Sequence, residues 1–182
     1  MTAAKTEISV SGLTIAYGDF VLLKDISFEV KKGDIFIIMG ASGGGKSSLL
    51  RVLTGLVPAA SGKIVIDGVD FTSANEPERQ KIMQKCGILY QSGALFSSMT
   101  LAENIALPLR QYTSYSDKLI AELVSLKLSL VGLTGFEEFY PSEISGGMKK
   151  RAGLARALAL DPDIVYFCLL YTSPSPRDLS TS

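Results

Sequence analysis

The chain contains no histidine, so none of its chemistry can depend on an imidazole as a base or as a metal ligand. It has only two cysteines, Cys86 and Cys168, which form neither a disulfide framework nor a cluster with metal-ligand spacing. This low number of cysteines is typical of a protein in a reducing cytoplasm. We expect Cys86 to be a small core residue.

Other absences narrow the class of protein further. No apolar stretch approaches the roughly 20 residues needed to span a membrane, and residues 1–7 lack the apolar segment of a signal peptide. Lysine plus arginine equals aspartate plus glutamate at 18 each, so no net basic field favours nucleic acid as a partner. The hydrophobic fraction of 47% suits a buried core, in one domain or in a core with a small subdomain.

The most informative segment present runs from Gly40 to Ser47 and fits the phosphate-loop pattern G-x-x-x-x-G-K-[ST]. The apolar run Ile35–Met39 before it predicts a strand buried on both faces, and leucines at helical spacing follow it. In that context backbone N–H groups cradle phosphates, whereas the alternative is a glycine-rich turn without a ligand. The residues predicted to bind a nucleotide here are Gly40, Ala41, Ser42, Gly43, Gly44, Gly45, Lys46, Ser47 and Ser48.

The segments on either side of this loop predict an antiparallel β layer. Before residue 35, apolar and polar residues alternate around a Gly18-Asp19 turn, as in paired strands. Residues 63–69 predict another short strand that ends in an Asp67-Gly68 turn. We expect this layer to flank the core that carries the phosphate loop.

The second half of the chain is predicted to be mainly helical, with short buried strands at residues 87–90 and 163–167. Thr100 and Glu103 have the spacing of a capping box, which predicts the start of a helix. Residues 116–132 predict a further amphipathic helix. Its expected apolar face consists of Leu119, Leu123, Leu126 and Leu130.

Ser145, Gly146 and Gly147 open a last predicted helix, at residues 145–160, and indicate a second anion site. Two glycines in a first helical turn cost about 1 kcal/mol each relative to alanine, a cost that makes sense if a ligand approaches the backbone closely. Ser145 is the expected N-cap, beside N–H groups that could face an anion. The alternative is a loop glycine pair that only starts a helix.

In this order the motifs resemble those of the ATP-binding-cassette (ABC) ATPases. Gly40–Ser47 is similar to their Walker A loop, Gln91 to their Q-loop glutamine, and Ile144–Met148 to their signature. Tyr17 is similar to the aromatic residue that stacks on adenine, although it could also be a core tyrosine at a strand end. The resemblance covers residues 7–167.

The resemblance implies an α/β phosphate-loop NTPase fold, with a RecA-like core, an antiparallel β layer and a helical subdomain at about residues 92–160. It also implies ATP and Mg²⁺ as cofactors, with Lys46 and Gln91 in catalysis and with Ser47 and Gln91 at the metal. Walker A of one copy would face the signature of a second copy in a two-fold dimer. Residues contacting the γ-phosphate across that interface would be Ser145, Gly146 and Gly147.

Within the family the chain is most similar to ATPases of phospholipid transporters of the maintenance-of-lipid-asymmetry (Mla) type. The segments that carry this likeness are residues 91–100 and 141–148. It implies docking on a membrane permease near Leu95, Phe96 and Met99, which could otherwise be ordinary core residues. The implied location is cytoplasmic, on the inner face of the plasma membrane.

Beyond residue 167 the chain departs from the family. ABC ATPases continue that strand with Asp-Glu-Pro, whose carboxylates hold Mg²⁺ and polarise water, whereas this chain has Cys168, Leu169 and Leu170. Residues 168–178 read as the translation of a transposase-based sequencing adaptor. We therefore expect residues 1–167 to be a partial nucleotide-binding domain, incomplete at its C-terminus, and residues 168–182 to be a non-native tail. A Ser/Pro-rich disordered tail and a degenerate cassette are the alternatives.

These observations favour the ATP-hydrolysing subunit of a lipid ABC transporter, although the chain as written is expected not to hydrolyse ATP. One alternative is a non-hydrolysing nucleotide-binding or regulatory protein. Another is an ABC ATPase of the DNA-repair type, but the chain shows no sustained heptad repeat of the kind that such proteins insert between the two motifs.

Overall fold

The computed structural model describes residues 5–91 and 93–168, which divide into two compact units. Among these residues, the first unit ends at Met83 and the second begins at Gln84. No helix in the described ranges is both long and apolar enough to cross a membrane.

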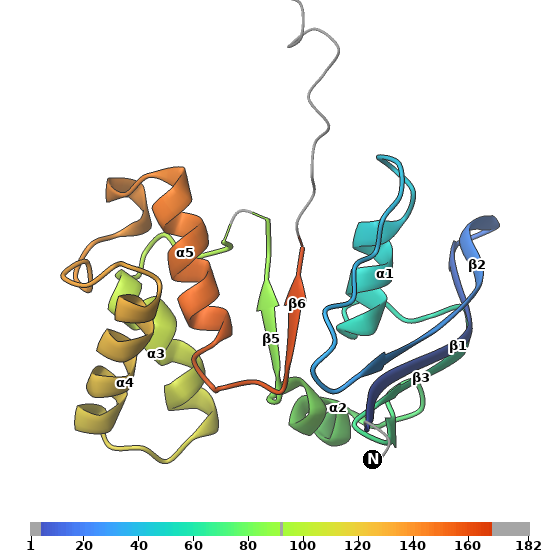
Figure 1. The fold of residues 1–182 in the computed structure, drawn as a ribbon, viewed down its shortest axis with the longest axis horizontal. Helices are drawn as coiled ribbons and strands as arrows, with labels where there is room; N and C mark the ends of the chain where they lie inside the picture. Colours follow the sequence, from blue (N-terminus) through green and yellow to red (C-terminus); the bar gives the residue numbers. More distant parts are fainter. Residues whose placement is uncertain (1–4, 92, 169–182) are drawn as a thin grey trace, which may run out of the picture. The chain divides into compact units, whose positions relative to one another are not determined.

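The first unit is built on an antiparallel sheet, as predicted, with the strand order β2-β1-β3-β4 (Figure 1). Along β1, the apolar side chains of Ile8, Val10, Leu13 and Ile15 are buried, and they form the core of this layer. The strands are β1 (Thr6–Tyr17), β2 (Phe20–Lys31), β3 (Ser61–Ile66) and β4 (Val69–Asp70).

Two helices complete this unit: α1 (Lys46–Leu53) and α2 (Glu76–Met83). The first of them was predicted from the leucine spacing after the phosphate loop. In α1 the buried side chains are Leu49, Val52 and Leu53. The only buried residue of α2 is Ile82.

The prediction of a buried strand at Ile35–Met39 is wrong for this structure. These residues belong to neither of the two sheets, and their exposed fractions run from 38% at Ile38 to 91% at Ile35. Phe36 stacks on Phe28 of β2, with 4.8 Å between ring centroids. A strand of this kind is buried when it lies inside a sheet whose two faces are covered by helices, and no strand of the described residues pairs with it.

The second unit combines helices with a parallel strand pair, in which Cys86 lies opposite Ile164 and Leu89 opposite Phe167. A cluster of buried aliphatic side chains, among them Leu101, Ile105, Leu128 and Leu133, joins α3, α4 and α5. The elements are β5 (Cys86–Leu89), α3 (Leu101–Tyr112), α4 (Asp117–Leu130), a 3₁₀ turn η1 (Pro141–Glu143), α5 (Gly146–Ala157) and β6 (Ile164–Phe167) (Figure 1).

The predicted helix starts are confirmed. Thr100 and Glu103 form a reciprocal capping box at α3, with hydrogen bonds of 3.1 and 2.8 Å. Ser145 caps α5, because its Oγ accepts from the Met148 N–H at 3.3 Å. Local capping chemistry therefore fixes these boundaries.

The predicted apolar face of α4 is wrong except at Leu123, which packs against the buried cluster. Leu119, Leu126 and Leu130 are 39%, 50% and 67% exposed. The buried residues of this helix are Ile120, Val124, Lys127 and Leu128, because they form the stripe that faces α3 and α5. Lys127 is buried because its ammonium pairs with the carboxylate of Asp161.

The parallel pair ends at Cys168, whose N–H donates to the carbonyl of Leu89 at 2.9 Å. Of the tail predicted to be non-native, residues 168–182, all but Cys168 lie outside the described residues.

Candidate nucleotide-binding site

The predicted phosphate loop is a left-handed glycine turn at the start of α1. Gly43 and Gly45 have φ values of 79° and 83°, which favour glycine. A Cβ at Gly45 would also lie 3.0 Å from Cγ of Leu23. The loop closes on itself through the Gly44 N–H, which donates to the Ala41 carbonyl at 3.1 Å. The backbone is thus bent in the way that a phosphate cradle requires.

The ammonium of Lys46 lies inside this turn. Its Nζ donates to the carbonyls of Gly40 at 2.8 Å and Ala41 at 2.7 Å. A lysine has three donors, so one remains for another acceptor. The side chain is held over the loop, which places a cation where phosphate oxygens could accept from it.

Tyr17 and Ser48 come together in the same unit. The Tyr17 hydroxyl lies 3.2 Å from Oγ of Ser48, and the phenol side chain is 46% exposed. Tyr17 therefore stands next to the first turn of α1 with an accessible aromatic face, which is what a stacking residue needs.

Ser47 is half-buried in the first turn of α1. Mg²⁺ needs few protein ligands when phosphate oxygens and waters complete its shell. A single hydroxyl beside the phosphate loop fits that requirement. In the described ranges, no group of three or more cysteine or carboxylate side chains could hold a metal ion.

The remaining predicted site residues lie in the second unit. Gln91 is exposed, in the turn that follows β5. Ser145, Gly146 and Gly147 are also exposed. Space around the backbone is open there, since a Cβ added at Gly146 would meet nothing within 4 Å. The N-terminus of α5 is therefore accessible to a ligand.

Cys86 and Tyr166 lie on the parallel pair, with Cys86 at the start of β5 and Tyr166 opposite Ile88. Burial raises the pKa of the Cys86 thiol to about 12, and burial also raises the pKa of Tyr166. Both groups are therefore neutral at physiological pH.

The segment between Gly93 and Thr100 contains the three predicted docking residues. Phe96 is 51% exposed, whereas Leu95 and Met99 are half-buried. Sequence reasoning missed Asn104, which is fully buried and whose amide bonds to this segment. An asparagine next to apolar residues in the first turns of a predicted helix is the signal that could have found it.

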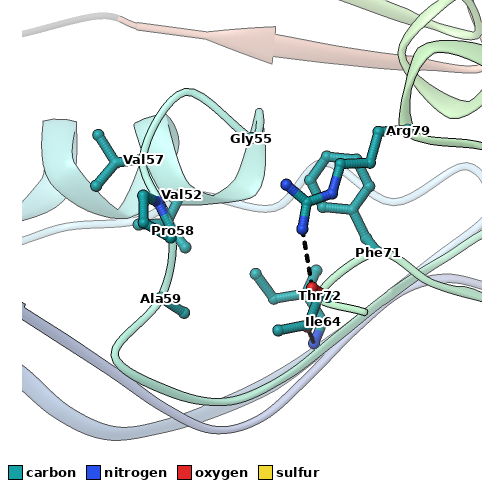
Figure 2. Close-up of a pocket in the computed structure, with 9 residues that line it drawn as sticks. All are labelled: Val52, Gly55, Val57, Pro58, Ala59, Ile64, Phe71, Thr72 and Arg79. Carbon is teal, nitrogen blue, oxygen red and sulfur yellow. Dashed lines mark hydrogen bonds between the residues drawn. The ribbon is translucent and has the colours of Figure 1, made fainter. Parts of the chain in front are cut away.

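A small cavity of about 80 Å³ lies beside the end of α1 (Figure 2). Arg79 borders it, donates to the Thr72 carbonyl at 2.8 Å, and lies over the ring of Phe71. None of the predicted nucleotide-binding residues lines this cavity, so it is separate from the phosphate loop. Its lining residues are Val52, Gly55, Val57, Pro58, Ala59, Ile64, Phe71, Thr72 and Arg79.

The chain is similar to known proteins. The family model described as "ABC transporter" matches residues 23–167. The MlaF protein of Haemophilus influenzae, an intermembrane phospholipid transport ATP-binding protein, is 42% identical over 93% of this chain and 64% of its own length. The mkl protein of Mycobacterium bovis, described as a probable ribonucleotide transport ATP-binding protein, is 46% identical over 87% of this chain and 44% of its own length. The chain thus spans less than two thirds of both relatives.

Solved structures agree with the sequence relatives. The dimeric bacterial ABC transporter cassette MJ0796 is 30% identical, with a TM-score of 0.82, over 88% of this chain and 72% of that one. The same cassette in a post-hydrolysis state with ADP and Pi gives a TM-score of 0.81. The predicted α/β phosphate-loop fold is confirmed by these matches. The chain belongs to the ABC transporter family, as a member with the fold of the ATP-binding cassette.

Proposed function

We propose that this chain is the nucleotide-binding part of an ABC transporter ATPase, in which two copies share each ATP. The observation that carries the proposal is the glycine turn with the Lys46 ammonium held over it by two carbonyls. A bound triphosphate would offer these donors better acceptors, because charged hydrogen bonds are about twice as strong as neutral ones.

Each residue has a separate role in this proposal. Lys46 would neutralise the β- and γ-phosphates, and Tyr17 would stack on the base. Ser47 and Gln91 would hold Mg²⁺, which when bound reduces the charge on the phosphates. Ser145, Gly146 and Gly147 would approach the γ-phosphate from the other copy.

The matched cassettes support the sharing of ATP between two copies, since MJ0796 is described as dimeric and as bound to ADP and Pi. An isologous dimer is also the simplest way to bring two different anion sites onto one ligand.

The chain as written should nevertheless turn over no ATP, because residues 168 and 169 are Cys and Leu. The test uses a longer protein, here called the continued chain. It carries Cys168→Asp and Leu169→Glu, followed by proline and by the C-terminal part that ABC ATPases have after these residues. We expect Mg²⁺-dependent ATP turnover from the continued chain. A matched protein with the same continuation but with Cys168 and Leu169 retained should lose several orders of magnitude in rate.

Turnover also separates the alternatives. A non-hydrolysing regulatory protein would bind ATP without turnover even in the continued chain, and that result would overturn the proposal. Equal rates with and without the two carboxylates would refute their assignment as the missing catalytic groups.

For the transported substrate we propose a phospholipid or another lipid, with docking on a membrane permease near Leu95, Phe96 and Met99 at the cytoplasmic face of the inner membrane. The support is the MlaF relative, whereas the mkl relative is named for ribonucleotides. With its membrane subunit in detergent, ATP turnover should rise when phospholipid is added and should not rise when uridine monophosphate, a ribonucleotide that the ATPase does not hydrolyse, is added. The reverse dependence would contradict the lipid assignment.

A further inference from the structure

We propose that Arg156 is a positioning residue that fixes the exposed Phe96 ring and its backbone to helix α5. The segment from Gly93 to Thr100 is here called the docking segment. This name, and with it the inference, rests on the proposed function. Arg156 adds a physical link between this segment and the helix that begins at Ser145.

The first part of the link is the guanidinium of Arg156, which lies near the C-terminal end of α5. Its Nη2 donates to the carbonyls of Gly93 at 3.2 Å and Ala94 at 2.9 Å. The central carbon of the same guanidinium, Cζ, lies 5.7 Å from the centroid of the Phe96 ring. The Arg156 side chain is half-buried, and this burial lowers its pKa. Hydrogen bonds and cation–π contacts are stronger in such surroundings.

The second part is a direct approach of two backbones, at Gly93 and Gly153. A Cβ on Gly153 would lie 2.7 Å from Cα of Gly93, and a Cβ on Gly93 would lie 2.6 Å from the carbonyl oxygen of Lys149. No side chain fits between the segment and α5 at these positions. The docking segment therefore rests on the helix backbone itself.

The third part comes from α3, where one buried amide holds the segment from the other side. Oδ1 of Asn104 accepts from the Phe96 N–H at 2.8 Å. Its Nδ2 lies 3.1 Å from the carbonyl oxygens of both Phe96 and Met99. Phe96 is thus held by its N–H, its carbonyl and its ring, although its side chain is half exposed.

In this arrangement we expect the exposed Phe96 ring to be held in one orientation. A preorganised aromatic residue loses little entropy on binding and suits the centre of an interface. Because the same helix carries the proposed γ-phosphate contact at Ser145, a displacement of α5 would carry Phe96 with it.

The test exploits the absence of tryptophan from the chain. In the continued chain, with the added part kept free of tryptophan, Phe96→Trp places a single indole at the site. Time-resolved fluorescence anisotropy then reports its motion without nucleotide or membrane partner. We expect Arg156→Lys, which keeps the charge but loses the planar fork, to increase the amplitude of nanosecond motion roughly twofold. Gly153→Ala should do the same by displacing Gly93.

The matched control is Arg110→Lys, an exposed arginine of the same unit that lies 3.6 Å from Asp117. It should leave the anisotropy decay unchanged. The proposal is overturned if Arg156→Lys leaves the indole as rigid as before in a protein that still melts cooperatively, or if Arg110→Lys mobilises it equally. Loss of ATP turnover has no bearing on either outcome, so failure of this inference is distinguishable from failure of the proposed function.

Discussion

Lys46→Ala in the continued chain is expected to lower ATP turnover by at least about 10²–10³-fold, the usual cost of removing one preorganised charge-stabilising donor. The ammonium is the only cation in the loop of residues 40–48, and two carbonyls hold it there. Alanine removes the charge and leaves the helical backbone intact, because alanine is the best helix former. Steady-state turnover at saturating ATP measures the effect.

The control for this change is Lys63→Ala, an exposed lysine in the same unit that lies 3.2 Å from Asp70. Its turnover should stay close to that of the parent protein, since an exposed ion pair contributes at most about 1 kcal/mol to stability. Near-normal turnover in Lys46→Ala would refute the role of the phosphate loop.

Ser145→Arg is expected to abolish turnover while ATP binding is preserved. The change puts bulk and positive charge at the open N-terminus of α5, where the γ-phosphate held by a second copy would have to lie. The phosphate loop of the same copy is unchanged, so its own affinity for ATP should be retained. Titration with a fluorescent ATP analogue and a turnover assay separate the two effects.

The chain offers a close control for this second change. Ser116 caps α4 in the same way as Ser145 caps α5, with its Oγ accepting from the Leu119 N–H at 3.3 Å. Losing either cap costs about 1 kcal/mol, so Ser116→Arg should destabilise the protein similarly and still permit turnover. Loss of ATP binding in Ser145→Arg, or equal loss of turnover in both variants, would count against the second anion site.

Local patterns in the sequence were sufficient for the helix starts and for the antiparallel layer. Capping at Thr100 and Ser145 depends on residues within one turn, so spacing alone predicts it. The glycine turn before Lys46 is predicted in the same way, because glycine adopts a positive φ readily. The helix starts and the glycine turn therefore depend on neighbours in the sequence.

The errors concern features that depend on distant neighbours. Ile35–Met39 has the apolar run of a buried strand, but burial of such a run depends on strands and covering helices from other parts of the chain. Helix α4 carries two overlapping apolar stripes, one with Leu119 and Leu126 and one with Ile120 and Val124. Only the contacts with α3 and α5 decide which stripe is buried.

Asn104 and Arg156 were missed for a related reason. Both bind backbone carbonyls of the docking segment, and Arg156 reaches across more than 60 positions, to Gly93 and Ala94. Every residue has a backbone carbonyl, so the residue types in the sequence do not indicate which carbonyl will accept such a hydrogen bond.

The central claim is that the phosphate loop and the N-terminus of α5 form one nucleotide site between two copies of the chain. Sedimentation velocity of the continued chain with a non-hydrolysable ATP analogue and Mg²⁺ tests it most directly. We expect a monomer that becomes a dimer when the analogue is added, and no such change in Ser145→Arg. A protein that binds the analogue at full occupancy and sediments as a monomer would contradict the account.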